Sequence, residues 1–154
     1  MRTRTFLASV VVFLAGIALA FAADANMGTW KLNEAKSKWT AGMTKNHTVV
    51  YSAAADMVKV TVDGVDKDGK PAHNEWTGKF DGKDYAVVGD PNLDARSYTR
   101  VDDHTLNMVF KKGGKVMGTG KVTVSADGKS RAVTNDYNDA SGKQMKATAV
   151  YDKQ

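Results

Sequence analysis

The stretch Gly28-Thr29-Trp30-Lys31-Leu32 opens a long series of short segments in which apolar and polar residues alternate. A period of two is typical of a β-strand with one buried face, because successive side chains point to opposite sides. We therefore predict that this stretch is the first strand of the fold, with Trp30 in its core.

The chain beyond this stretch is divided by glycine-containing turn signals. Asp-Gly, Gly-Gly and Ser-Gly pairs supply the positive φ angles that tight hairpin turns need. No segment beyond residue 22 has convincing helical periodicity, although 33–38 could form a single turn. The predicted strands are 28–33, 46–53, 57–63, 71–80, 84–88, 95–101, 104–112, 115–125, 130–137 and 143–152.

A meander of this length protects its edge strands by closing into a barrel or by packing two sheets face to face. Consecutive hairpin turns without a long crossover favour the barrel over a Greek-key sandwich. We therefore predict an all-β domain over residues 23–154. Its expected architecture is a single antiparallel up-and-down β-barrel of about eight to ten strands. Gly28 and Trp30 would form a structural plug at one end of it.

Residues 1–22 have the features of a cleavable signal peptide. Arg2 and Arg4 form a charged start, the run 6–21 is almost entirely apolar, and Ala20-Phe21-Ala22 is a small-x-small cleavage site. The apolar run is shorter than the about 20 residues that span a bilayer. We therefore expect no integral membrane segment after cleavage, and a location in the periplasm or, second, secretion.

Cleavage would leave 132 residues with 20 Lys and Arg against 17 acidic residues, a net charge of +3. Such a small and scattered charge argues against a nucleic-acid partner. The chain contains no cysteine, so no disulfide bond can stabilise an exported domain of this size. A hydrophobic core must do so instead, and about 130 residues can supply one.

A family resemblance rests on the two ends of the domain. Gly28-Thr29-Trp30 matches the Gly-x-Trp that opens the first strand of lipocalins and fatty-acid-binding proteins. The run 149–153 is similar to the closing strand of the fatty-acid-binding branch. On these motifs, residues 27–153 resemble a bacterial lipocalin-like domain of the calycin type. The resemblance implies a barrel with an apolar interior that binds a small molecule or lipid.

Two features of the fatty-acid-binding branch are missing. Its helix pair after the first strand does not fit into Glu34–Lys45, which has only 12 residues. Its carboxylate-binding Arg two residues before the terminal Tyr is replaced by Ala149. The opening Gly-Thr-Trp also occurs in avidin-like barrels, and 30–37 is similar to the first strand and turn of polyisoprenoid-binding periplasmic proteins. The resemblance therefore predicts a barrel without naming its ligand.

Patterns that would indicate catalysis or metal binding are weak. The chain has no cysteine and no Gly-x-Ser-x-Gly elbow, so we expect a non-enzymatic protein without catalytic residues. The three histidines are widely separated, and no two have the short spacing of a chelating pair: His47, His73 and His104. His73 and Glu75 share one strand face, which fits a solvated outer surface. We expect no metal and no cofactor.

Arg96, Tyr98 and Arg100 share one face of a predicted strand. If that face points inward, two guanidiniums and a phenol could hold an anionic head group. If it points outward, the arginines are solvated while Ala95, Thr99 and Val101 pack inside. Burying an unpaired arginine is costly, so we favour the outward orientation. The predicted cavity lining, with the arginines conditional on the inward orientation, is Trp76, Phe80, Arg96, Tyr98, Arg100, Leu106, Met108, Phe110 and Met145.

Three functions remain open at this stage. The leading hypothesis is an exported, non-catalytic protein that binds a small apolar or amphipathic molecule inside its barrel. The alternative is a solid barrel whose outer surface acts as an envelope protein-interaction module or inhibitor, which would require a contiguous surface patch. An enzyme would require convergent titratable groups in a cleft. The oligomeric state is left open.

Overall fold

The computed structural model describes residues 24–139 and 141–154. The predicted signal peptide lies outside this range. Ten predicted strands are confirmed within two residues at each boundary, and one short strand, β2, is additional. The elements are β1 (Gly28–Leu32), the 3-10 turn η1 (Glu34–Lys36), β2 (Lys38–Trp39), β3 (Lys45–Ala54), β4 (Met57–Val65), β5 (Pro71–Gly78), β6 (Tyr85–Val88), β7 (Ala95–Asp102), β8 (Thr105–Lys112), β9 (Lys115–Val124), β10 (Ser130–Asn138) and β11 (Gln144–Lys153).

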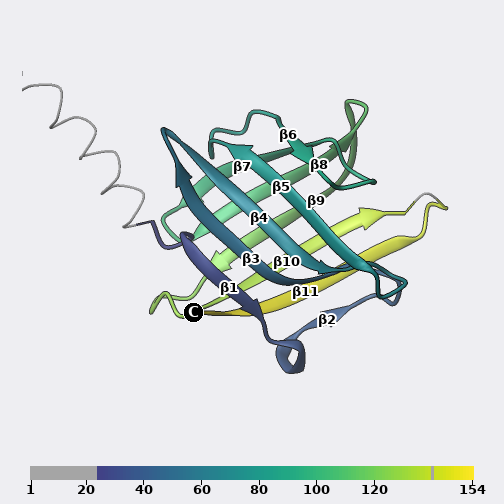
Figure 1. Cartoon of the computed structure of the whole chain (residues 1–154), viewed down its shortest axis with the longest axis horizontal. Coiled ribbons are helices and arrows are strands. Elements are labelled where there is room, and N and C mark those ends of the chain that lie inside the picture. The colour runs from purple at the N-terminus through teal and green to yellow at the C-terminus, as the bar shows by residue number, and fades with distance from the viewer. Residues whose placement is uncertain (1–23, 140) are drawn as a thin grey trace, which may run out of the picture.

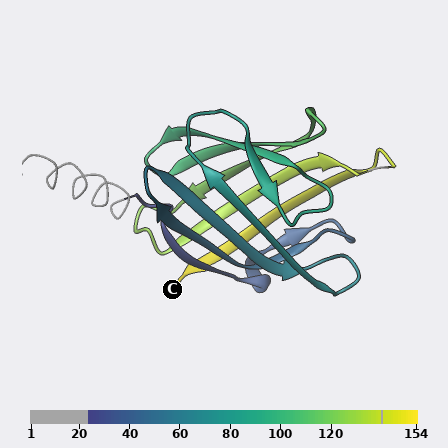
Figure 2. The same cartoon turned by 45° about the horizontal axis from the view of Figure 1, so that its top comes forward.

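The strands form a closed antiparallel barrel. From β3 to β11 each strand pairs with the next, and β1 closes the ring by pairing with both β3 and β11. This gives ten barrel strands in up-and-down order, with β2 as one outer strand, and it confirms the predicted fold class. Figure 1 shows β1, β3, β4 and β5 crossing in front of the wall formed by β8 to β11, and Figure 2 shows the same crossing from a second direction.

The additional strand β2 continues the path of β1. Its residues Lys38 and Trp39 pair with Thr148 and Ala147, on the edge of β11 that β1 occupies further along. The single turn predicted for this region lies between them as η1, where the Asn33 side chain accepts a hydrogen bond from a backbone N–H. A strand of two residues has no alternation to detect, which explains why the sequence pattern did not predict it.

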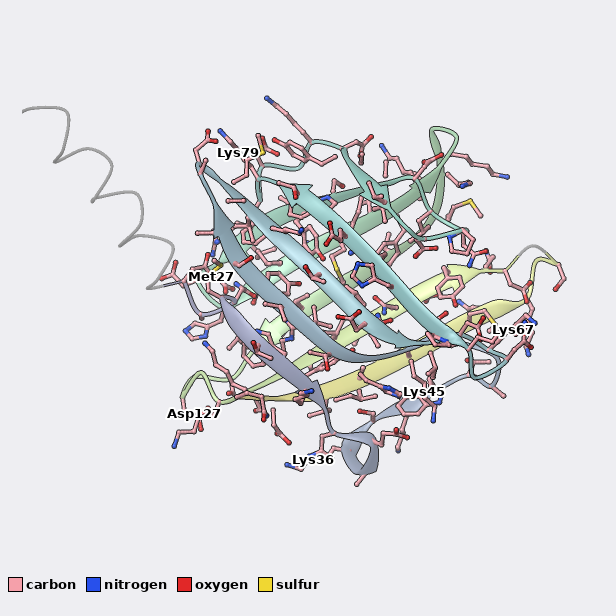
Figure 3. The ribbon with its side chains drawn as sticks, viewed as in Figure 1. Met27, Lys36, Lys45, Lys67, Lys79 and Asp127 are labelled. Carbon is pink, nitrogen blue, oxygen red and sulfur yellow. The ribbon has the colours of Figure 1, made fainter. Side chains whose placement is uncertain are left out.

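One end of the barrel, the base, lies beside the segment 24–27 and the turn 125–130. Figure 3 labels Met27 and Asp127 at this end. Trp30 is fully buried here and donates from Nε1 to the carbonyl oxygen of Asn26 at 2.9 Å. Eleven inward-facing side chains of the base are at most 4% exposed: Trp30, Tyr51, Val58, Val60, Trp76, Tyr98, Leu106, Val122, Val124, Arg131 and Tyr151.

The Arg131 guanidinium is part of this packed base. Its central carbon lies 4.6 Å from the ring centre of Trp30, 4.8 Å from that of Tyr51 and 5.1 Å from that of Tyr151. A desolvated cation over an aromatic face gains about 2 kcal/mol, so three rings together stabilise a charge buried here. Burial raises the pKa of Tyr51 above its ordinary range and that of Tyr151 to about 12.

Within the described residues, no helix is long and apolar enough to cross a membrane.

Candidate functional site

The opposite end of the barrel, the mouth, carries the turns 66–70 and 113–114, and Figure 3 labels Lys67 at its rim. Its inward-facing positions hold small or polar residues where the base holds aromatic ones. Several of these side chains remain partly exposed to solvent although they face the barrel interior. They are Ala72, Asn74, Asn135, Tyr137 and Ala147.

Strand register determines this lining. Met108 pairs with Gly120, Gly120 with Asn135, and Asn135 with Ala147, so one row crosses β8 to β11. Directly paired residues share a face, and Met108 is buried in the core, so the whole row points inward. A Cβ on Gly120 would lie 2.6 Å from both Met108 Cε and Asn135 Oδ1. Glycine at position 120 therefore allows a close approach of these side chains that a larger residue would prevent.

Four inward-facing polar side chains have a buried atom without a hydrogen-bond partner among the described residues. Arg131, with Nε and Nη1, lies in the packed base. The other three lie nearer the mouth: Asn74 on β5 with Oδ1, Arg96 on β7 with Nε, and Asn135 on β10 with Oδ1. A buried polar atom without a partner costs about 1 to 3 kcal/mol. The interior of the barrel therefore retains hydrogen-bonding capacity that the protein itself does not use.

Arg96 lies where the base meets the mouth. Its Nη1 donates to the Tyr98 hydroxyl at 3.4 Å, and its central carbon lies 5.7 Å from the ring centre of Phe110. Its carbonyl oxygen accepts a 2.8 Å hydrogen bond from Trp76 Nε1, which fixes the backbone of β7 against β5. The side chain of Arg96 is only 7% exposed.

The outward orientation favoured for Arg96 and Tyr98 is wrong. Both are buried, whereas Val101, expected inside, is 56% exposed. The reason is the pairing of β7 with β8: Arg96 lies opposite Phe110 and Tyr98 opposite Met108. The apolar face of β8 points into the core. Because directly paired residues point to the same side of a sheet, the face of β7 that carries Arg96 and Tyr98 points inward as well.

Arg100 belongs to the same face but not to the same environment. It is exposed at the base, where Nη2 forms an ion pair with Asp24 Oδ2. Its central carbon also lies 5.1 Å from the ring centre of Phe80. A guanidinium that already has a carboxylate partner cannot serve as the predicted anchor inside the barrel.

The other predicted lining residues divide between the two ends. Trp76, Phe80 and Leu106 lie in the packed base, where the Trp76 and Phe80 rings stack at 6.2 Å. The residues on the mouth side are Met108, Phe110 and Met145. Sequence reasoning missed Asn74 and Asn135, although the parity that Asn74 shares with Trp76 was a signal for the first.

Two further groups of titratable side chains lie at the mouth and on the outer wall. At the mouth, burial and then the charges of Asp90 and Asp139 raise the pKa of Tyr137. On the outer wall, His73 Nδ1 lies 2.6 Å from Asp63 Oδ1 with both side chains about half exposed, so the solvated face predicted for His73 is present. No cluster of three or more His, Asp or Glu side chains suited to a metal ion occurs in the described part of the chain.

Two hollows open on the surface, one on the outer wall and one at the rim of the mouth. One, of about 650 Å³, crosses β8 to β11 between two rows of outward side chains that include Asn107, Lys121 and Asp136. The other, of about 430 Å³, lies between the η1–β2 segment and the ends of β3 and β4, beside Trp39 and Lys45. The first hollow is also lined by Asn135 and the rest of its row, Met108, Gly120 and Ala147, whereas neither hollow is lined by Asn74 or Arg96.

Comparisons with known proteins add little to this description. No family model matches the chain, and no curated protein matches it. Among solved structures, it is similar to EF1p2_mFAP2b bound to DFHBI, with a TM-score of 0.48 and 14% identity over 88% of this chain and 98% of that one. It is also similar to a redesigned β-barrel, mFAP1, bound to DFHBI, with a TM-score of 0.45 and 16% identity over 86% and 99%. At such values, neither likeness bears on what this chain binds.

Proposed function

We propose that this protein is an exported, non-catalytic carrier or sensor that binds a small amphipathic molecule through the mouth of its barrel. The observation that supports the proposal most is the set of buried, partnerless polar atoms on Asn74, Arg96 and Asn135. They face an interior whose side chains are partly exposed at this end. Apolar contacts with Met108, Phe110 and neighbours would supply affinity, and the polar groups would set orientation.

Native mass spectrometry of the protein purified from the periplasm of its own source tests the proposal. A small molecule retained on the folded chain supports it. A matched pair of variants then locates the site: Ala147→Leu fills the mouth, whereas Thr148→Leu points outward on the same strand. Loss of the bound mass in the first variant alone is expected. Retention in both, or a wild-type protein that never carries a bound mass, contradicts the proposal.

The outer hollow across β8 to β11 favours a second candidate function, an interaction module that acts through its surface. The polar side chains Asn107, Lys121 and Asp136 would contact a partner there. Lys121→Glu would reverse the charge of this wall without touching the interior. Loss of a partner recovered by cross-linking from the native envelope, with unchanged small-molecule binding, would favour this function over the first.

A further inference from the structure

Three arginines of the described chain lie at or inside the base, and their environments differ. Arg100 has Asp24 as an ion-pair partner, and Arg131 lies against the faces of three aromatic rings. Arg96 has neither arrangement, because its contacts are one phenol at 3.4 Å and the more distant ring of Phe110. Arg131 has two guanidinium nitrogens without a hydrogen-bond partner, but three aromatic rings surround it in the packed base. Arg96 has one such nitrogen, and it is the buried arginine with neither a carboxylate nor a close aromatic face.

This matters because a guanidinium does not lose its proton in a protein. A buried charge without a counter-ion costs several kcal/mol, and such charges are retained where something pairs with them. No carboxylate of the described residues lies within 4.0 Å of the Arg96 guanidinium, since the ion pair of Arg100 is the one that these arginines form. Arg96 therefore has no counter-ion among the described residues, and an anion from outside the chain would supply one.

The hydroxyl of Tyr98 reinforces this reasoning. It accepts hydrogen bonds from Arg96 Nη1 and from the Tyr51 hydroxyl, both at 3.4 Å. A phenol has one proton to donate, and an anionic group beside Arg96 would accept it. The unpartnered atom at this depth, Arg96 Nε, is also a donor.

We infer that the molecule bound by this barrel carries an anionic group, and that Arg96 and Tyr98 hold it where base and mouth meet. This inference rests on the proposed function and specifies its ligand class: a carboxylate, sulfonate or phosphate joined to an apolar body. The body extends toward the mouth past Phe110 and Met145, and methionine side chains adapt readily to such a shape. The carboxylates of Asp90 and Asp139 lie at the rim, where water and salt screen them.

A pair of fluorescent probes with one scaffold separates charge from apolar binding. 8-Anilinonaphthalene-1-sulfonate carries a sulfonate, and N-phenyl-1-naphthylamine is its neutral counterpart. Arg96→Met is expected to weaken binding of the sulfonate probe about tenfold or more, because a charge-assisted hydrogen bond is lost, and to leave the neutral probe nearly unchanged. Tyr98→Phe should weaken the sulfonate probe by about threefold. Arg100→Met, with its guanidinium outside the interior, is the matched control and should change neither affinity.

Thermal unfolding guards against a purely structural explanation. Removing an uncompensated buried charge is expected to leave the melting temperature of Arg96→Met unchanged or raised, whereas losing a structural arginine lowers it. Arg96→Lys keeps a positive charge and should retain most of the sulfonate affinity. If Arg96→Met binds both probes as the wild type does, the anion inference fails and the proposed function stands. If the wild type binds neither probe, both fail.

Discussion

The two ends of this barrel are built from the same strands but packed in opposite ways. At the base, large side chains such as Trp30 and Leu106 are fully buried, and aromatic rings surround even the Arg131 charge. At the mouth, the same strands turn inward Asn135 and Ala147, which remain partly exposed. The base therefore supplies most of the stability that holds the ring closed, while the mouth leaves polar groups without a partner among the described residues.

The largest effect that tests this contrast comes from two tryptophans at opposite ends. Trp30→Ala should lower the free energy of unfolding by about 3 to 5 kcal/mol, because a fully buried indole and its hydrogen bond to Asn26 are lost. Trp39→Ala on β2, where the indole is partly exposed, should cost only about 1 to 2 kcal/mol. Urea unfolding measures both. Similar losses in the two variants would remove the distinction between the ends.

A second test asks whether the interior on the mouth side can accommodate an added methyl group at Gly120. Gly120→Ala should destabilise by about 1 to 3 kcal/mol, because the new methyl group meets Met108 Cε and Asn135 Oδ1 at 2.6 Å. Thr119→Ala, its outward neighbour, should change stability by less than about 0.5 kcal/mol. If Gly120→Ala leaves stability unchanged in the same unfolding assay, the side chains around position 120 rearrange at little cost.

Much of the fold could be predicted from the sequence. The turn residues predict where the strands end, and the alternation predicts which residues of each strand share a face. Alternation within one strand cannot decide which face points inward, as Arg96 shows. That choice depended on the pairing of Arg96 with Phe110 on β8, a long-range contact that no local pattern contains.

The candidate site was less predictable than the fold for a related reason. The prediction rule places polar residues outside, so Asn74 and Asn135 were passed over although their parity matched that of core residues. Asn74 and Asn135 break this rule, and each has a buried oxygen without a partner among the described residues. Such departures from the pattern are expected where a chain is shaped for binding.

A third, smaller effect follows from this reasoning. Asn135→Val should stabilise the protein by about 1 kcal/mol, since it replaces a buried amide oxygen without a partner by an apolar group. Thr134→Val, next to it but outward, should have almost no effect. Thermal and urea unfolding measure the difference. A destabilised Asn135→Val would mean that the amide has a structural role that outweighs its unused capacity.

The smallest expected effect lies on the outer wall beside the mouth. The hydrogen bond from His73 to Asp63, assisted by the charge of Glu75, raises the pKa of His73 above its ordinary value. The folded state then holds the His73 proton more tightly than the unfolded state. The resulting stabilisation is fully present below the unfolded pKa of about 6.5 and is lost as the pH rises through the raised folded pKa.

The melting temperature should therefore fall slightly between about pH 6 and pH 8, and His73→Gln or Asp63→Asn should flatten that slope equally. Because both side chains are about half exposed, salt at about 1 M should flatten it as well. A slope that survives in both variants would place the titrating group elsewhere. If the loss of stability over this pH range exceeds the gain from Asn135→Val, the ion pair on the outer wall contributes more to stability than the unpartnered amide inside the barrel costs.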